Sequence, residues 1–423
     1  KEKNTGNGGF IYASRHIDIM PSRFADRSTI FTDESVLFED WTPEELPERK
    51  KELKQLEDAF APATRGVGAD NVFLYGKAGQ GKTAAATFAV NELQYHADHE
   101  SDILDLSVFS ISCESLSTSF QVVSQIVYKL CGEDMAGKST NKAFNRMYEE
   151  FNKIGGTINL ILDEIDNIGG EDQILYSSPR SRAKQYVNDD VYPSVVGISN
   201  DLKWRDTLSP KVKDSLYDES VHFPPYDANK LGSILERRAE KAFIEGDVLG
   251  QEVIPLASAF AAQDKGSARQ AIGYLRRAGK IASSNKDQKV TGDHVREAEQ
   301  VIEKKRVEEG MRDLTAQGHL ALAAITALEL SGDTPVKTKI IYSMYKNIAR
   351  EIDADVLAIR RMRDHLNDLD MQGILVKSEF NRGRAGGKSN SYELSVEPET
   401  AAEIISNVSR FENLNFDSIQ RRI

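Results

Sequence analysis

The sequence NVFLYGKAGQGKT, residues 71–83, decides the fold of the chain. Its first part, Val72 to Tyr75, is a short run of β-branched and aromatic residues typical of a buried strand. Gly76 ends this run, and Gly76-x4-Gly81-Lys82-Thr83 is the complete phosphate-binding loop pattern. An Ala-rich helix is predicted directly after it, from about Thr83 to Tyr95. A strand, a glycine-rich turn and a helix in this order predict an α/β nucleotide-binding domain.

The residues of this loop are suited to hold a triphosphate. A glycine-rich turn points successive backbone N–H groups inward, and the following helix adds the partial positive charge of its N-terminus. Lys82 is placed to reach the β- and γ-phosphates, and the Thr83 hydroxyl can complete the shell of a Mg²⁺ ion. An ordinary turn with a surface lysine is the alternative, which the flanking strand and helix disfavour. The expected nucleotide-binding residues are Gly76, Lys77, Ala78, Gly79, Gln80, Gly81, Lys82, Thr83 and Ala84.

A second motif, TINLILDEIDNI at residues 157–168, supplies carboxylates. Its apolar residues up to Leu162 predict a fully buried strand, and Asp163 and Glu164 follow at the C-terminal end. In an ATPase site Asp163 would hold Mg²⁺, and Glu164 would polarise the attacking water as general base. An acidic turn after any buried strand is the simpler interpretation of this motif alone. The phosphate-binding loop favours the catalytic interpretation.

A further apolar run, residues 195–198, ends at Ser199 and Asn200. The Asn200 amide at the tip of a strand could orient water or contact the γ-phosphate. Asn is also a common turn former, so this pattern alone does not separate the two roles. Strands alternate with helices throughout residues 71–224, and this alternation predicts a parallel sheet.

The bulk composition limits the class of protein. The chain has 423 residues, 40% of them hydrophobic and 28% charged, which suits roughly two to three domains. No run approaches the ~20 apolar residues of a membrane span, and the N-terminal residues lack the apolar core of a secretion signal. Two cysteines indicate a reducing compartment, and the scattered histidines form no metal-site pattern.

The net charge of −12 counts against a protein that coats nucleic acid indiscriminately, because such binding needs many Lys and Arg contacts. A local basic face remains compatible with this charge. The excess of acidic residues elsewhere in the chain is also compatible with adaptation to a salty cytoplasm. Composition alone does not decide whether this adaptation is present.

Changes in pattern along the chain predict its domains. Pro224-Pro225 interrupts the strand-helix alternation, and only helical patterns follow from Asp227 to about Glu308. The charged residues 303–310 predict a hinge. We therefore expect a flexible N-terminal arm at residues 1–40, a nucleotide-binding base at 41–224, a small all-helical lid at 225–308 and a further domain at 309–423. In the lid, Arg269 opens a helix from which it could face the phosphates.

The C-terminal part predicts a winged helix-turn-helix domain. Three helical patterns, at residues 319–330, 336–352 and 355–372, precede a β-hairpin. In the third, Ile359, Met362, Leu366 and Leu369 form one apolar stripe. Arg360, Arg361 and Arg363 lie largely off that stripe. Arg382, Arg384 and Lys388 gather at the tip of the hairpin. A charged tip is often solvated loop, but behind an arginine-bearing helix it favours contact with DNA.

Together these motifs resemble a known family, the archaeal initiators of the AAA+ ATPases, which are similar to eukaryotic origin-recognition and licensing proteins. The match runs from about Ile30 to Val396. By this resemblance, residues 76–83 correspond to the Walker A motif and residues 160–166 to the Walker B motif. It also implies that residues 171–190 form the helical insertion through which members of the family contact DNA. The site residues that it adds are Leu46, Pro47, Arg49 and Tyr226 toward the nucleotide, Asn200 and Arg269 as sensors, and Arg180 and Arg182 toward DNA.

The resemblance implies an ATP-dependent replication initiator in the cytoplasm, associated with the nucleoid and with no membrane. Such a protein uses ATP, ADP and Mg²⁺, binds double-stranded origin DNA and helps to recruit the replicative helicase, with other initiator copies as further partners. One position departs from the family, because Lys211 replaces an arginine that completes a neighbouring subunit's ATP site. Lysine lacks the planar fork of arginine, so slow, switch-like hydrolysis is expected.

Two other functions stay open. In a signalling-type ATPase switch the winged helix would pack internally rather than on DNA, which the insertion at 171–190 and the basic hairpin tip disfavour. A motor or clamp-loading enzyme would turn over fast, which Lys211 disfavours.

Overall fold

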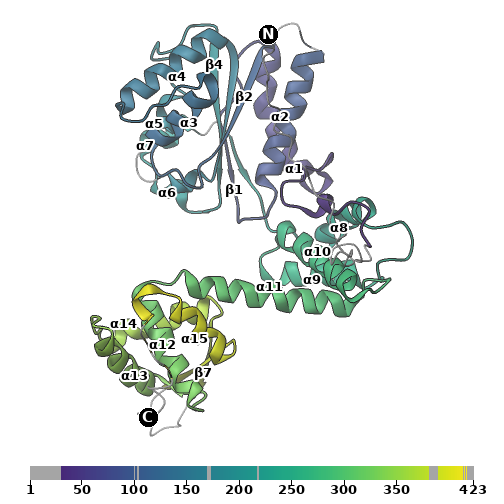
Figure 1. Ribbon diagram of the computed structural model, residues 1–423. Helices are drawn as coiled ribbons and strands as arrows, with labels where there is room; N and C mark the ends of the chain where they lie inside the picture. Colours follow the sequence, from purple (N-terminus) through teal and green to yellow (C-terminus); the bar gives the residue numbers. More distant parts are fainter. Residues whose placement is uncertain are drawn as a thin grey trace, which may run out of the picture. The chain divides into compact units, whose positions relative to one another are not determined.

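The computed structural model describes residues 30–416 except residues 100, 102, 103, 169–172, 217, 218, 381–388, 413 and 415. The chain divides into two compact units, an N-terminal unit of residues 1–295 and a C-terminal unit of residues 296–423. Figure 1 labels the elements of both units. Every helix among the described residues is too short or too polar to span a lipid bilayer.

A five-stranded sheet in the order β2-β3-β4-β1-β5 forms the centre of the N-terminal unit, and its paired strands are all parallel. The strands are β1 (Val72–Tyr75), β2 (Leu106–Ser112), β3 (Gly156–Asp163), β4 (Val191–Ser199) and β5 (Glu219–His222). The carboxyl ends of parallel strands lie at one edge, so the residues that follow β1, β3 and β4 meet there.

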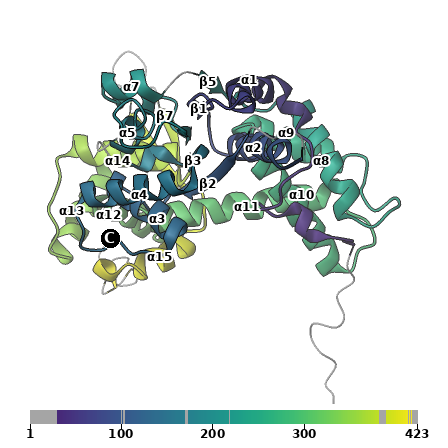
Figure 2. The ribbon, with the colours of Figure 1, turned by 90° about the horizontal axis from the view of Figure 1, so that it is seen from above.

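Helices cover both faces of this sheet. Helices α1 and α2 lie on one face and α3 and α4 on the other (Figures 1 and 2). In β3, Ile161 packs toward α1 and α2, whereas Leu160 and Leu162 pack toward α3 and α4. A strand buried on both faces needs a continuous apolar run, which confirms the predicted α/β fold. The helices are α1 (Lys50–Phe60), α2 (Lys82–His99), α3 (Ser119–Cys131), α4 (Thr140–Ile154), α5 (Gln173–Ser177), α6 (Trp204–Thr207) and α7 (Pro210–Leu216).

Strand β4 begins at Val191, four residues before the apolar run that predicted it. Pro193 obscured this start, because proline in a strand usually marks an edge or a break. In the structure β4 pairs with β3 from Val191 onward but with β1 only from Val196. Pro193 therefore lies in the part of β4 that has no β1 neighbour. On that side no N–H group is needed for pairing, so the proline is tolerated.

The second part of the N-terminal unit is helical, as predicted for a lid. Its helices are α8 (Ala228–Ala242), α9 (Val253–Asp264) and α10 (Ala268–Asn285). Helix α11 (Gly292–Arg312) begins in this unit and continues into the C-terminal unit. The helix predicted to open near Arg269 begins at Ala268, where the Ser267 side chain accepts a hydrogen bond from the N–H of Gln270 as a cap. The predicted domain boundaries at 224/225 and 308/309 remain predictions.

The segment of residues 30–41, here called the strap, corrects the expectation of an arm that is flexible up to residue 40. It contains the 3₁₀ helix η1 (Glu34–Leu37), and Ile30, Val36 and Leu37 are buried. The Phe31 ring packs against that of Phe243, with ring centroids 4.8 Å apart and the ring planes tilted by 36°. These few apolar residues have no period that the sequence could reveal, but together they cover one side of α8 and α10.

The hinge expected at residues 303–310 is wrong, because these residues form the C-terminal half of α11. Two ion pairs within one helical turn support the helix there, Arg306 with Glu303 at 2.8 Å and Lys305 with Glu309 at 3.6 Å. The dense charges of residues 303–310 therefore belong to a helix whose charged side chains pair with one another, and not to a hinge.

The C-terminal unit has the predicted winged helix-turn-helix arrangement. Its helices are α12 (Ala316–Leu330), α13 (Thr338–Glu351), α14 (Ile359–Met371) and α15 (Pro398–Ser406), followed by the 3₁₀ helix η6 (Ser409–Phe411). Its sheet has the antiparallel order β6-β8-β7, with β6 (Val336–Lys337), β7 (Leu375–Phe380) and β8 (Ser389–Leu394). Gly373 follows the C-cap residue Gln372 of α14 and has φ of +74°, the left-handed conformation with which helices commonly end.

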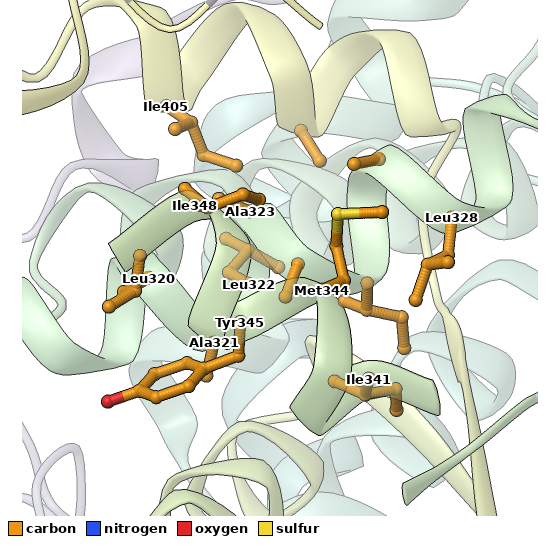
Figure 3. Close-up of a cluster of buried hydrophobic side chains, with 14 of the residues drawn as sticks. Leu320, Ala321, Leu322, Ala323, Leu328, Ile341, Met344, Tyr345, Ile348 and Ile405 are labelled. Carbon is orange, nitrogen blue, oxygen red and sulfur yellow. The ribbon is translucent and has the colours of Figure 1, made fainter. Parts of the chain in front are cut away.

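Helix α12 forms the centre of this unit and is buried on almost every side. Figure 3 shows Ile341, Met344 and Ile348 of α13 gathered with side chains of α12, and Ile405 of α15 beside them. A helix that is hydrophobic all round is expected to be enclosed by other elements. The domain thus has its own core, which fixes α14 in place.

Candidate functional site

The carboxyl edge of the parallel sheet brings together the predicted nucleotide residues. Tyr75 at the end of β1 lies opposite Ser199 at the end of β4, and Leu162 of β3 lies opposite Gly197. The loop after β1, the carboxylates after β3 and Asn200 after β4 therefore come from neighbouring strands. Residues more than one hundred positions apart in the sequence converge here because the strands are parallel.

The loop after β1 needs two of its glycines for conformation and for space. Gly79 and Gly81 have φ of +75° and +81°, a region that favours glycine. A side chain at Gly79 would meet the Ser267 hydroxyl of the lid, and one at Gly81 would approach the Tyr226 hydroxyl to 2.7 Å. Helix α2 starts directly after this loop, at Lys82, so its N-terminus faces the turn.

Lys82 is a buried cation with three acceptors. Its Nζ donates to the carbonyl oxygens of Gly76 at 2.8 Å and Lys77 at 2.9 Å, and to Oδ1 of Asn200 at 2.8 Å. Burial lowers the pKa of Lys82 to about 8, although the carboxylate of Asp163 acts in the opposite direction. The ammonium group therefore lies inside the loop, aimed at the phosphate position rather than at solvent.

Thr83 and Asp163 supply oxygen atoms of the kind that Mg²⁺ prefers. The Thr83 hydroxyl donates to Oδ2 of Asp163 at 2.6 Å, so both predicted metal residues are within one hydrogen bond of each other. Among the described residues, no three or more His, Cys, Asp or Glu side chains come together in a group that could hold a metal ion. A hydroxyl and one carboxylate fit a magnesium ion that takes its remaining ligands from phosphate and water.

Glu164 has the environment of a general base. It adopts a left-handed backbone conformation, with φ of 57° and ψ of 42°, at the start of the 3₁₀ helix η4 (Ile165–Asn167). Burial and the nearby Asp163 carboxylate raise the pKa of Glu164 above its ordinary value. A left-handed residue that is not glycine or asparagine is uncommon, and such strain gathers at functional sites.

Asn200 connects the loop with the carboxylates. Its Oδ1 accepts from Lys82, and its Nδ2 lies 3.4 Å from Oε1 of Glu164. Its main-chain N–H donates to Oδ1 of Asp166 at 3.1 Å. The structure thus brings together Lys82, Glu164 and Asn200 as predicted. The contact with Asp166 is an addition that the sequence indicated only as a third carboxylate.

The lid touches the phosphate-binding loop directly. The N–H of Ala268 at the start of α10 donates to the carbonyl oxygen of Gly79 at 2.9 Å. Arg269, the next residue, is exposed and forms an ion pair with Glu39 of the strap, Nε to Oε2 at 3.2 Å. The structure therefore places Arg269 beside the loop, with a partner that the sequence analysis missed because no pattern links residues so far apart.

The expected adenine side is organised around Arg49. Arg49 is buried, donates to Glu52 at 2.9 Å and to the carbonyl oxygen of Pro224 at 2.7 Å, and lies 3.8 Å from the centre of the Tyr226 ring. It thus fixes Tyr226 rather than presenting its charge to solvent. Leu46 and Pro47 precede it and are half-buried.

The remaining loop residues differ in exposure. Lys77, Ala78 and Thr83 are exposed, and Ala84 is half-buried. The Gln80 side chain is buried, and neither of its amide atoms has a hydrogen-bond partner within the described residues.

The candidate DNA residues divide into three groups. In α14, Arg360, Arg361 and Arg363 are exposed, while Met362, Leu366 and Leu369 are buried, which agrees with the predicted stripe. In the N-terminal unit, Arg180 and Arg182 follow α5 and lie over aromatic rings, at 5.2 Å from Tyr176 and 4.4 Å from Tyr192. The third group, Arg382, Arg384 and Lys388, lies outside the described residues.

Comparison with known proteins agrees with these features. Residues 65–184 match the AAA domain, residues 232–300 the Cdc6 AAA+ ATPase-type lid domain, and residues 309–404 the C-terminal winged helix domain of CDC6. The solved structure of the Aeropyrum pernix ORC1 protein in complex with DNA is 34% identical, with a TM-score of 0.73, and the match covers 92% of this chain and 100% of that one.

Curated relatives match over nearly their whole length. ORC1-type DNA replication protein 8 of Halobacterium salinarum is 39% identical over 392 residues, which are 92% of this chain and 98% of that protein. An ORC1-type DNA replication protein of Pyrococcus abyssi is 36% identical over 395 residues, 90% of this chain and 91% of that protein. With the three domain matches and the site at the sheet edge, these identities show that the chain belongs to the family of ORC1-type DNA replication proteins.

Proposed function

We propose that the chain is an ATP-controlled replication initiator that binds double-stranded origin DNA and helps to recruit the replicative helicase. The exposed arginines of α14 above its buried apolar stripe carry the DNA part of this proposal. In a winged helix-turn-helix domain this helix is the one that enters the major groove. The related Aeropyrum protein was solved with DNA, which supports the same partner here.

The nucleotide site assigns a role to each residue at the sheet edge. Bound ATP with Mg²⁺ would supply the phosphoanhydride and the charge that polarises it, with Thr83 and Asp163 holding the metal. Lys82 would bind the β- and γ-phosphates as a desolvated cation. Glu164 would accept the proton of the attacking water, and its raised pKa makes it a stronger base than an ordinary glutamate. Asn200 would orient that water.

Hydrolysis in this protein is proposed to be slow, so that ATP acts as a switch. Lys211, in α7, is exposed, and the family resemblance implies an arginine at this position that completes a neighbouring subunit's ATP site. A lysine is a point charge without the planar donor fork of arginine, so it stabilises transition-state charge less well. Assembly with other initiator copies would then accelerate turnover only weakly.

A second DNA contact is proposed at the residues after α5. Arg180, Arg182 and Lys184 lie over the rings of Tyr176 and Tyr192, which hold these long side chains in place. A cation whose position is already fixed loses less conformational entropy on meeting a phosphate. The hairpin tip with Arg382, Arg384 and Lys388 is proposed as a third contact.

Footprinting of the purified protein on its own genomic DNA, with ATP, with ADP and without nucleotide, tests this function. We expect protection of discrete sites, with an extent that depends on the nucleotide. Protection that is uniform along the DNA would contradict origin recognition. Failure to bind any duplex would favour the signalling-type switch.

A further inference from the structure

Asp166 is the third carboxylate of the motif at residues 160–166 and has no role in the nucleotide chemistry proposed above. It lies in the one-turn helix η4, two residues after Glu164, and is half-buried. Its Oδ1 accepts the main-chain N–H of Asn200 at 3.1 Å. The contact joins two neighbouring strand ends, because Asp166 follows β3 and Asn200 follows β4.

The turn that carries Asp166 also contacts β4 through the neighbouring residue Ile165. Ile165 is fully buried, and a side chain at Gly197 would come within 2.7 Å of its Cδ1 atom. Glycine at position 197 thus leaves room for Ile165. Three residues further along the chain, directly after the end of β4, Asn200 meets Asp166. Two contacts, one apolar and one polar, therefore fix this turn against β4.

The fixed backbone of Asn200 matters because its amide faces two different partners. Lys82 carries only donors, so the amide oxygen must face it, at 2.8 Å. The amide nitrogen then faces the Glu164 carboxylate, which accepts, at 3.4 Å. A shift of the Asn200 main chain would loosen both contacts together.

We infer that Asp166 is a positioning residue, which anchors the Asn200 main chain and thereby places the Asn200 amide between Lys82 and Glu164. This inference rests on the proposed ATPase function. The hydrogen bond and the charge are separable, because an asparagine at position 166 keeps an acceptor oxygen and loses the charge.

Steady-state ATPase measurements on Asp166→Ala and Asp166→Asn test this role. Asp166→Ala should lower kcat by roughly tenfold to a hundredfold, the effect of a displacement near 1 Å, with little change in ATP affinity. Asp166→Asn should retain most of the wild-type kcat. Asn167→Ala, an exposed neighbour in the same turn, is the matched control.

A double-mutant cycle with Asn200→Ala separates positioning from general damage. If Asp166 acts through Asn200, Asp166→Ala should lower kcat little further in the Asn200→Ala background. Losses that multiply, or a loss in Asp166→Asn as large as in Asp166→Ala, would overturn the role. Wild-type kcat in Asp166→Ala would overturn it as well. Absence of ATP hydrolysis by the wild-type protein would instead contradict the proposed function.

Discussion

The nucleotide edge of the N-terminal unit and the arginine face of α14 use cations in opposite ways. At the sheet edge Lys82 is buried and bonded to three oxygen atoms before any ligand is considered. On α14 the three arginines are exposed, and only the apolar stripe beneath them is fixed by packing. A buried, prearranged site should respond to substitution with near-complete loss, whereas a surface should lose affinity gradually.

The largest effect is expected from Lys82→Ala. A triphosphate in the loop would lose its principal countercharge, so ATP affinity should fall by at least about a hundredfold. Titration with a fluorescent ATP analogue measures this loss. Lys77→Ala, an exposed lysine in the same loop, is the matched control and should remain within a few fold of wild type. Equal affinity of wild type and Lys82→Ala would disprove the assignment of the site.

The pH dependence of binding sharpens this prediction. Burial lowers the pKa of Lys82 to about 8. The side chain is therefore still charged at neutral pH and loses its proton as the pH rises through about 8. As pH rises above about 8, the free protein must take up a proton to bind ATP, so affinity should fall by up to tenfold per pH unit. The decline should end at the higher pKa that Lys82 has beside bound phosphate.

Glu164→Gln should separate binding from hydrolysis. The amide keeps the shape of the side chain but cannot accept a proton, so hydrolysis should fall by about 10²- to 10⁴-fold while ATP stays bound. Single-turnover measurements with labelled ATP detect both properties. Glu114→Gln removes a nearby carboxylate that also affects the pKa of Glu164, and it should leave the rate within an order of magnitude. Wild-type turnover in Glu164→Gln would exclude this residue as the base.

On the DNA side the losses should be smaller and graded. Arg360→Ala or Arg361→Ala should cost about 1 to 3 kcal/mol per lost base contact and relax the sequence preference at particular positions. The double change of Arg382 and Arg384 to Ala should weaken binding to every duplex and flatten the slope of log affinity against log salt by up to about 2. Titrations of specific and random duplexes at several salt concentrations distinguish the two variants. Unchanged binding in both would move the DNA contact elsewhere.

The sequence predicted the parts of the site that short patterns encode. A strand, a glycine-rich loop and a helix at residues 71–95 have a fixed spacing, and two carboxylates after a buried strand have a fixed place in a parallel sheet. The strap could not be predicted, because its burial depends on α8 and α10, some two hundred residues away. Arg49 shows the same limit, since its partner Pro224 is 175 residues distant.

Asp166 and the residues 303–310 illustrate two other limits. Asp166 was visible as a carboxylate, but only the register of β3 and β4 shows that it meets Asn200. The charges at 303–310 were visible too, but a hinge and a helix with paired charges have similar composition. In both cases the residue types were readable, and the missing information was which atoms meet.

The smallest effect concerns Arg269, a cation that we propose for the nucleotide site and that is exposed like those of α14. Its ion pair with Glu39 joins side chains that are 59% and 72% exposed, and such pairs contribute about 0 to 1 kcal/mol. If Arg269 leaves Glu39 to contact phosphate, Glu39→Gln removes a competitor and should raise ATP affinity by at most about fivefold. The gain should shrink as salt screens the pair and should vanish in an Arg269→Ala background. Glu44→Gln is the matched control, because Glu44 forms a comparable exposed pair with Lys241 of the lid at 3.1 Å. Calorimetric titration with ATP at low and high salt measures these differences, and an equal gain with or without Arg269 would show that Glu39 does not act through it.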